Sequence, residues 1–147
     1  MSERNADSEV DLTDRSGYHR WTTITIRYRD QDPLKHVNNS VYSEWFEVAR
    51  VALTESLSAP GPDWLVTSLG RMTINFLAET TFPGEVQVGA RLISIGNRSF
   101  RSGLAVFRDD RCLATADCIS VYFDPRIRSS VTPPPEVRAA MEQELAS

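Results

Sequence analysis

The chain has 147 residues, with 16 basic and 20 acidic side chains, a formal net charge of −4 at pH 7 and a hydrophobic content of 41%. This length favours one domain, and this apolar content suffices for a hydrophobic core. An acidic total without a basic run argues against a nucleic-acid binder, because affinity for the phosphate backbone comes from clustered positive charge. No apolar stretch approaches the roughly 20 residues that cross a bilayer and the N-terminus has no signal-peptide segment, so we expect a cytoplasmic protein that binds neither nucleic acid nor membrane.

The N-terminal segment, residues 1–18, is predicted to be a disordered leader, since acidic side chains dominate it and apolar ones are few. Residues 19–147 are predicted to form a single domain. An alternating pattern that runs from Trp21 to Tyr28 predicts the first strand, with Tyr28 among the residues of one face. The polar segment 30–39 contains a proline and is predicted to be a loop.

The longest helical pattern runs from Ser40 to Leu57, and Asn38 or one of the two residues after it can cap its start. The pattern is apolar around most of the helix circumference, so we expect this helix to be buried on most sides. The narrow polar stripe that remains consists of Glu44, Glu47, Arg50 and Thr54. Because Glu47 and Arg50 are three residues apart, they are predicted to form an ion pair within this stripe.

The rest of the chain alternates with the period of β-strands and ends, after a run of prolines, in a short amphipathic helix. The predicted strands cover residues 71–77, 85–95, 99–108 and 112–123. A phase shift near Ile93 predicts a bulge, and Asp109 and Asp110 predict a hairpin turn between the last two strands. The packed face of the terminal helix is predicted to consist of Val137, Ala140, Met141 and Leu145. Strands that follow by hairpins favour an antiparallel sheet, and a sheet curled around the long helix would explain why that helix is so apolar.

The two cysteines, Cys112 and Cys118, lie six residues apart in one predicted strand, which separates them by ~20 Å. A disulfide needs Cα atoms within roughly 7 Å, so both are predicted to be free thiols, as in a reducing compartment. The sequence has no Cys-x-x-Cys pair and two histidines, His19 and His36, so we expect no structural zinc site.

The loop before the long helix concentrates reactive side chains, namely Asp30, Asp32 and His36. A helix N-terminus presents unpaired backbone N–H groups and the positive end of the helix dipole, which can stabilise an oxyanion that forms on a carbonyl. A carboxylate a few residues earlier can attack that carbonyl or activate water. The arrangement therefore favours acyl transfer, with Asp30 more suited to loop or cap hydrogen bonds.

The run from Asp30 to Tyr42, Asp-x-Asp-x-x-x-His-Val-Asn-Asn-x-x-Tyr, followed by Glu-x-x-Arg from Glu47, resembles the signature of the 4-hydroxybenzoyl-CoA thioesterase-like acyl-CoA thioesterases. The resemblance implies the α+β hotdog fold, in which an antiparallel sheet of about five strands wraps around a long central helix. It also implies a homodimer or homotetramer with active sites at the subunit interface. The activity that it implies is hydrolysis of the thioester bond of a fatty or aromatic acyl-CoA.

The resemblance also assigns roles within the loop. The family's catalytic carboxylate, a nucleophile or a general base, falls on Asp32, for which the competing interpretation is a turn-forming residue. The backbone N–H that polarises the thioester carbonyl falls on Asn39. The histidine of related acyl-carrier-protein thioesterases falls on His36, which either contacts substrate or orders the loop, whereas the asparagine of those enzymes falls on Leu34. Lys35 stands where the family commonly has glycine.

Coenzyme A, as part of the substrate, carries phosphates that arginine binds well. Arg98 and Ser99 are candidates for this contact because they lie at a turn between two predicted strands, close to where the family often binds coenzyme A, and Arg71 is a further candidate. The competing interpretation of all three is a solvated strand surface. No separate cofactor and no metal ion are expected.

Two other functions stay open on sequence alone. One is release of a fatty acyl or polyketide chain from acyl carrier protein, which would need a positive surface around the pocket mouth because that carrier is acidic. The other is a non-catalytic acyl-CoA-binding hotdog protein, and the presence of Asp32 argues against it.

Overall fold

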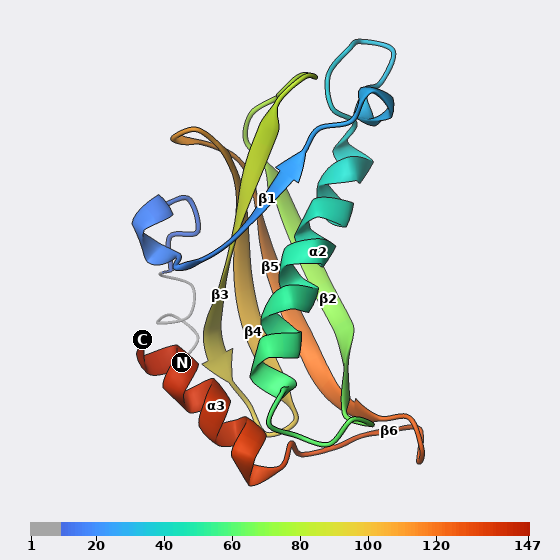
Figure 1. The fold of residues 1–147 in the computed structure, drawn as a ribbon, viewed down its shortest axis with the longest axis vertical. Helices are drawn as coiled ribbons and strands as arrows, with labels where there is room; N and C mark the ends of the chain where they lie inside the picture. The colour runs from blue at the N-terminus through green and yellow to red at the C-terminus, as the bar shows by residue number, and fades with distance from the viewer. Residues whose placement is uncertain (1–9) are drawn as a thin grey trace.

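One antiparallel sheet and two helices make up most of the structure, a computed structural model that describes residues 10–147 (Figure 1). The strands are β1 (Arg20–Thr25), β2 (Val66–Phe76), β3 (Glu85–Ile95), β4 (Ser99–Arg108), β5 (Arg111–Asp124) and β6 (Ser129–Ser130). The helices are α2 (Asn39–Ser58) and α3 (Pro135–Ala146), and two 3₁₀ turns are η1 (Arg15–Gly17) and η2 (Tyr28–Asp30). The strand order is β1-β3-β4-β5-β2, with β6 paired to β5, so β1 and β2 form the two edges.

The long helix α2 lies across the hollow of the curled sheet, as the sequence predicts (Figure 1). The Asn38 side chain accepts a hydrogen bond from the Ser40 amide at 3.0 Å and caps the helix start. The buried face consists of Val41, Tyr42, Trp45, Phe46, Ala49, Arg50, Leu53, Thr54 and Leu57. The opposite face is open to solvent, with Val48 53% exposed. The expectation of burial on most sides is therefore wrong for a single chain, because one curled sheet covers one side of the helix.

The strand predictions agree closely with the structure after α2. Strands β3 and β4 have the predicted bounds, and β5 is one residue longer at each end. The bulge is confirmed by a register shift between Leu92 and Ser94, and the hairpin turn by Asp109, whose φ is 54°. Strand β2 begins at Val66, five residues before its predicted start, because the 66–70 segment pairs with the end of β5.

The first strand is shorter than predicted. Strand β1 ends at Thr25, and the amide of Ile26 then donates to the carbonyl of Gly84. Tyr28 lies in η2 and is 77% exposed, so its expected place on a strand face is wrong. The local cause is Asp30, whose side chain accepts from the Arg27 amide and turns the backbone away from the sheet.

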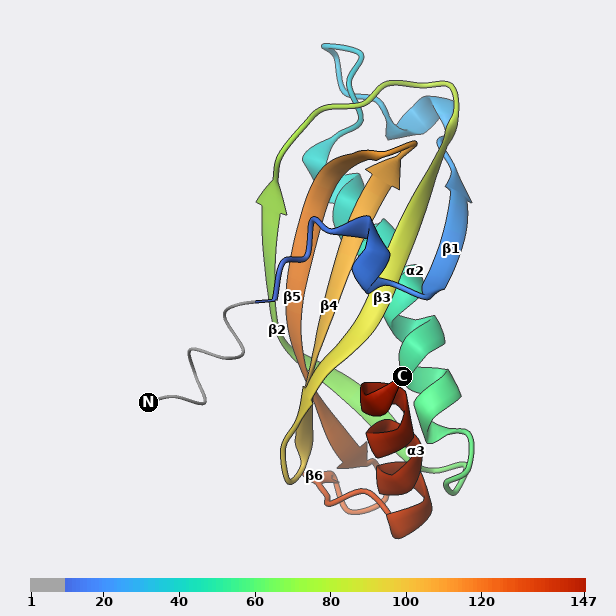
Figure 2. The same cartoon turned by 90° about the vertical axis from the view of Figure 1, so that its left-hand side faces the viewer.

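The segment 10–18 packs against the outer face of the sheet, opposite α2 (Figure 2). Tyr18 is 6% exposed, and its hydroxyl donates to the carbonyl of Leu12 at 2.7 Å. Gly89 of β3 makes room for the tyrosine ring, since a Cβ there would lie 2.7 Å from Tyr18 Cγ. The prediction of disorder is therefore wrong for residues 10–18, because a few apolar side chains find sites on the sheet, and its remainder, residues 1–9, lies outside the described residues.

The terminal helix α3 packs beside α2 and the end of β3 (Figures 1 and 2). Val137 and Met141 are fully buried, as predicted, whereas Leu145 is 43% exposed. Glu144 faces β1 and accepts two hydrogen bonds of 2.8 Å from the Arg20 guanidinium, which holds the pKa of that carboxyl below its usual value. A charged contact thus replaces the expected apolar one at the last turn.

Both cysteines are free thiols, as predicted. Cys118 is fully buried, and its burial raises the pKa of the thiol to about 11. Neither α2 nor α3, within residues 10–147, is long and apolar enough to cross a membrane.

Candidate active site

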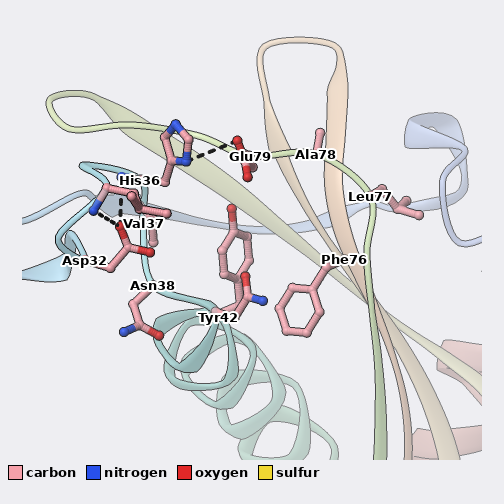
Figure 3. A pocket seen from close by; sticks show the side chains of 11 residues that line it. Asp32, His36, Val37, Asn38, Tyr42, Phe76, Leu77, Ala78 and Glu79 are labelled. Atoms are coloured by element: carbon pink, nitrogen blue, oxygen red, sulfur yellow. Dashed lines mark hydrogen bonds and ion pairs between the residues drawn. The ribbon is translucent and has the colours of Figure 1, made fainter.

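A pocket of about 410 Å³ opens at the N-terminus of α2 (Figure 3). The loop before α2 forms one wall, and the chain that leaves β2 forms the other. The lining residues are Asp32, Leu34, His36, Val37, Asn38, Asn39, Tyr42, Phe76, Leu77, Ala78 and Glu79. The structure thus brings together Asp32, His36 and Asn39, the three residues to which the sequence assigns catalysis.

Asp30 anchors this loop from beneath. Its carboxylate is 1% exposed and accepts hydrogen bonds from the Arg27 amide, Nε and Nη2 at 2.7, 3.0 and 2.8 Å. Its carbonyl oxygen accepts from the Asn38 amide at 2.9 Å, which ties η2 to the start of α2. Asp30 therefore does structural work, as the sequence analysis favoured.

Asp32 both closes a turn and lines the pocket. Its Oδ1 accepts from the Leu34 amide at 2.9 Å and from the His36 amide at 3.3 Å (Figure 3). The backbone closes the same turn, since the Asp32 amide donates to the His36 carbonyl at 2.8 Å. These bonds fix the direction of the carboxylate and occupy Oδ1, while Oδ2 makes no hydrogen bond among the described residues.

Lys35 adopts the left-handed conformation, with φ at 65°. Glycine enters this region without strain, whereas a side chain there costs roughly 1–2 kcal/mol. The departure from the family's glycine therefore leaves the loop shape intact and adds strain, together with an exposed ammonium group beside the pocket.

His36 contacts a carboxylate that sequence reasoning missed. Its Nδ1 lies 3.1 Å from Glu79 Oε2, across the pocket mouth (Figure 3). Glu79 follows β2 in an irregular segment more than forty residues later in the chain, and nothing in its local sequence indicates this contact. The pair links the two walls of the pocket.

Asn39 is the first residue of α2 and lines the pocket. The next two amides, of Ser40 and Val41, donate to the side chain and the carbonyl of Asn38. Among the described residues no acceptor takes the Asn39 amide, so this N–H is available to a ligand atom at the positive end of the helix dipole.

Tyr42 and Phe76 form the apolar floor of the pocket. Their rings meet edge to face with centroids 5.6 Å apart, which joins α2 to the end of β2. Tyr42 is 1% exposed, and burial raises the pKa of its hydroxyl, so it is neutral at physiological pH. The floor suits an apolar group next to a reacting carbonyl.

The proposed coenzyme A contacts lie elsewhere on the chain. Ser99 pairs with Val121, whereas Phe76 of the pocket pairs with Ala114, and the separation of seven positions on β5 spans roughly 23 Å. Arg98 precedes Ser99, at the same far end, where its Nη1 lies 3.4 Å from Ser130 Oγ. Arg71 lies midway along β2, and it is exposed on the outer face of the sheet. The structure does not bring these three residues to the pocket within one chain.

Within residues 10–147 no group of three or more histidine, cysteine, aspartate or glutamate side chains is close enough to hold a metal ion. The pocket thus combines two carboxylates, of Asp32 and Glu79, with the N-terminus of α2.

The family model described as the thioesterase-like superfamily matches residues 26–141. A Pseudomonas aeruginosa protein, PA5185, is similar with 26% identity and a TM-score of 0.76, over 88% of this chain and 94% of that one. A Thermus thermophilus thioesterase, solved with coenzyme A and zinc, has 25% identity and a TM-score of 0.77, over 89% and 97%. A Staphylococcus aureus DHNA-CoA thioesterase shares the fold at 16% identity, with a TM-score of 0.75 over 86% and 90%. No curated protein matches the sequence.

Proposed function

Because the chain belongs to the thioesterase-like superfamily and has its hotdog fold, we propose that it hydrolyses acyl-CoA thioesters, with Asp32 as the catalytic carboxylate and the Asn39 amide as the oxyanion donor. The observation that carries the proposal is that both residues line one pocket, Asp32 from the loop before α2 and Asn39 from the first position of α2. The similarity to a thioesterase solved with coenzyme A supports an acyl-CoA substrate.

The reaction needs one base and one oxyanion donor. With Asp32 as general base, its carboxylate takes a proton from water while the water oxygen attacks the thioester carbonyl carbon. The negative charge that forms on the carbonyl oxygen is stabilised by the Asn39 N–H and the helix dipole. Collapse of this intermediate breaks the C–S bond, and the coenzyme A thiolate recovers the proton. With Asp32 as nucleophile, its carboxylate attacks the carbonyl carbon, the C–S bond breaks, and coenzyme A leaves as a thiolate while an acyl anhydride forms. Water then cleaves the anhydride, which frees the acid and the Asp32 carboxylate, and a proton from this water goes to the thiolate.

His36 and Glu79 act as positioning residues in this proposal. Their contact joins the loop of Asp32 to the chain that follows β2, and so holds the pocket at a fixed width.

A homodimer through β2 would complete the site. This edge strand has unpaired backbone groups on one side and exposes Val66, Leu69 and Phe76 along its length. Antiparallel pairing of two β2 strands would bring the Val66 end of one chain beside the Phe76 end, and hence the pocket, of the other. Since Arg98 and Ser99 lie near the Val66 end, they would then face coenzyme A bound to the partner chain.

The test is thiol release from a panel of aromatic, short and long acyl-CoAs and from acyl carrier protein thioesters, with Asp32→Asn as the variant. Asparagine keeps Oδ1 and therefore the two turn-forming hydrogen bonds, but it loses the charge and the basicity. We expect kcat to fall at least a hundredfold with an unchanged Tm. Asp63→Asn, at an exposed site far from the pocket, is the matched control.

Each outcome of this test separates the candidate functions. A parent protein that cleaves none of the thioesters but binds acyl-CoA would be a binding protein, and the hydrolase proposal would fail. Selective cleavage of carrier-protein thioesters would move the function to that carrier. Full activity of Asp32→Asn would overturn the role of the carboxylate.

A further inference from the structure

Arg50 carries a charge into the interface between α2 and the sheet. Its side chain is 8% exposed, and its Nε is buried with no hydrogen-bond partner among the described residues. The predicted ion pair with Glu47 exists, but at 3.7 Å and with a Glu47 side chain that is 67% exposed, so it contributes little. A buried guanidinium is normally held by several acceptors. Arg50 lacks the acceptor that its burial requires.

Two buried hydroxyl groups lie on the sheet beneath this part of the helix. Ser102 of β4 and Ser120 of β5 are fully buried, and neither hydroxyl makes a hydrogen bond of regular geometry. Ser102 is paired in register with Cys118, whose thiol lies next to it. Burial raises the pKa of that thiol, while the positive charge of Arg50 and the Ser102 hydroxyl oppose the rise. The interface between α2 and the sheet therefore contains the buried Arg50 Nε and two buried serine hydroxyls.

A cleft connects Arg50 to the exterior. It has a volume of about 420 Å³ between the second half of α2 and the start of β2, and its walls include Arg50, Thr54 and Val66. The candidate active-site pocket lies at the other end of the same two elements, at Tyr42 and Phe76. The β2 side chains between the two ends, Met72 and Ile74, are apolar and partly buried against the core. The contact between α2 and β2 is thus polar at the end near Arg50, apolar in the middle at Met72 and Ile74, and next to the candidate active site at the other end.

We propose that Arg50 binds the far end of the acyl group, and that the preferred substrate is an acyl thioester whose acyl chain ends in a carboxylate. This inference rests on the proposed function, since it assigns the acyl side of the same site. A terminal carboxylate would accept from the Arg50 guanidinium and from the hydroxyls of Ser102 and Ser120. A methyl end would leave all three groups buried and unpaired.

The geometry also sets a chain length. Asn39 and Arg50 are eleven residues apart on α2, which corresponds to roughly 16 Å along the axis. Helix side chains lean toward the N-terminus by about one turn, or about 5 Å, so the guanidinium lies about 11 Å from the oxyanion site. An extended chain advances about 1.2 Å per bond, which gives about nine bonds. Acyl chains of about eight to ten carbons fit this distance.

The experiment compares two thioesters of equal length, octanoyl-CoA and the mono-CoA thioester of octanedioic acid. We expect kcat/KM of the parent protein to be at least tenfold higher for the second, from one charge-assisted pair in a buried site. Arg50→Met should remove this preference, and Arg50→Lys, which keeps the charge without the planar donor pair, should retain a part of it. Arg111→Met, at the exposed start of β5, is the matched control and should keep the full preference.

A binding measurement makes the result independent of hydrolysis. Octanedioate should raise the Tm of the parent more than octanoate does at the same concentration, and the difference should vanish in Arg50→Met. Equal cleavage of the two thioesters by the parent, or a preference that survives in Arg50→Met, would overturn the inference while leaving the hydrolase proposal intact. If neither of these thioesters is cleaved, the full panel of acyl-CoAs decides on the hydrolase proposal, and the two melting shifts decide for or against the Arg50 site. If Arg50→Met does not fold, Ser120→Ala, which removes an unpartnered hydroxyl, takes its place and should lower the preference severalfold.

Discussion

The loop before α2, residues 30–38, is held by short-range hydrogen bonds more than by packing. Asp30 joins η2 to the start of α2, and the Asp32 side chain closes the turn that precedes it. Lys35 then carries the backbone through a left-handed conformation, with φ at 65°. Each of these residues acts on a neighbour within eight positions in the chain, which is why a local motif identifies the loop so well.

The strain at Lys35 yields a stability prediction. Lys35→Gly should be more stable than Lys35→Ala by about 1 kcal/mol, because glycine alone enters the left-handed region freely. At an ordinary exposed loop position the alanine variant is the more stable of the two, since alanine restricts the conformations of the unfolded chain. Denaturant unfolding of the two variants measures the difference in their free energies of unfolding. Both variants lack the ammonium group, so the loss of charge affects them equally. A Lys35→Ala protein that is as stable as Lys35→Gly would show that the backbone is not strained.

At the scale of elements, side chains far apart in the sequence join α3 to β1. Glu144 near the end of α3 accepts a pair of hydrogen bonds from Arg20, and His19 Nε2 lies 2.9 Å from the same carboxylate. The Glu144 side chain is 9% exposed, so solvent screens this contact less than it does a surface ion pair. The last turn of α3 is therefore attached by charge, while Val137 and Met141 attach the first turns by apolar burial.

This attachment makes part of the stability depend on pH. The hydrogen bonds from Arg20 hold the pKa of Glu144 below 4.5 in the folded chain, so protons bind more readily to the unfolded chain. The stabilisation is complete above about 4.5 and is lost as the pH falls through the lower folded pKa. We expect Glu144→Gln to be less stable than the parent by about 1 kcal/mol at pH 7, and the difference to shrink toward pH 3. Melting curves from pH 3 to pH 7 measure it, and a difference that grows with acidity would contradict the assignment.

At the scale of the whole molecule, the edge strand β2 is the feature that a single chain leaves without a neighbouring strand on one side. Residues 10–18 cover a part of the outer face of the sheet, and α2 fills its hollow (Figure 2). Strand β2 keeps a free side with three exposed apolar residues. An edge of this kind associates readily with another strand, and a second copy of the chain is the partner that the proposed function requires.

The corresponding prediction concerns both mass and activity. The parent should sediment at two or four times the chain mass of 16.5 kDa. Leu69→Lys, which places a charge on the β2 edge, should shift the population toward the monomer and lower the activity in parallel, because in the proposed dimer Arg98 of one chain would contact coenzyme A bound to the other. Leu145→Lys, at an exposed apolar site on α3, should change neither property. A parent that is monomeric and fully active would contradict the shared site.

Much of the fold and the loop could be predicted from sequence because both depend on periodic or contiguous signals. The alternation of β3 and β4 marks their bounds, and the contiguous run from Asp30 to Tyr42 marks the loop and the helix start. The predictions that failed concern Tyr28 and residues 10–18. Tyr28 left the strand because Asp30 turns the backbone, and residues 10–18 became ordered because the sheet offers sites such as the space at Gly89.

The sequence by itself determined the identity of the reactive loop, the long helix and the hairpin sheet, since hydrophobic period and local hydrogen bonding act over a few residues. The tertiary structure decided which distant groups meet. It brought Glu79 to His36, placed Arg98 far from the pocket of its own chain, and buried the Nε of Arg50 between α2 and the sheet without a hydrogen-bond acceptor among the described residues. Such contacts depend on the register and curl of the whole sheet, which no short segment of the chain encodes.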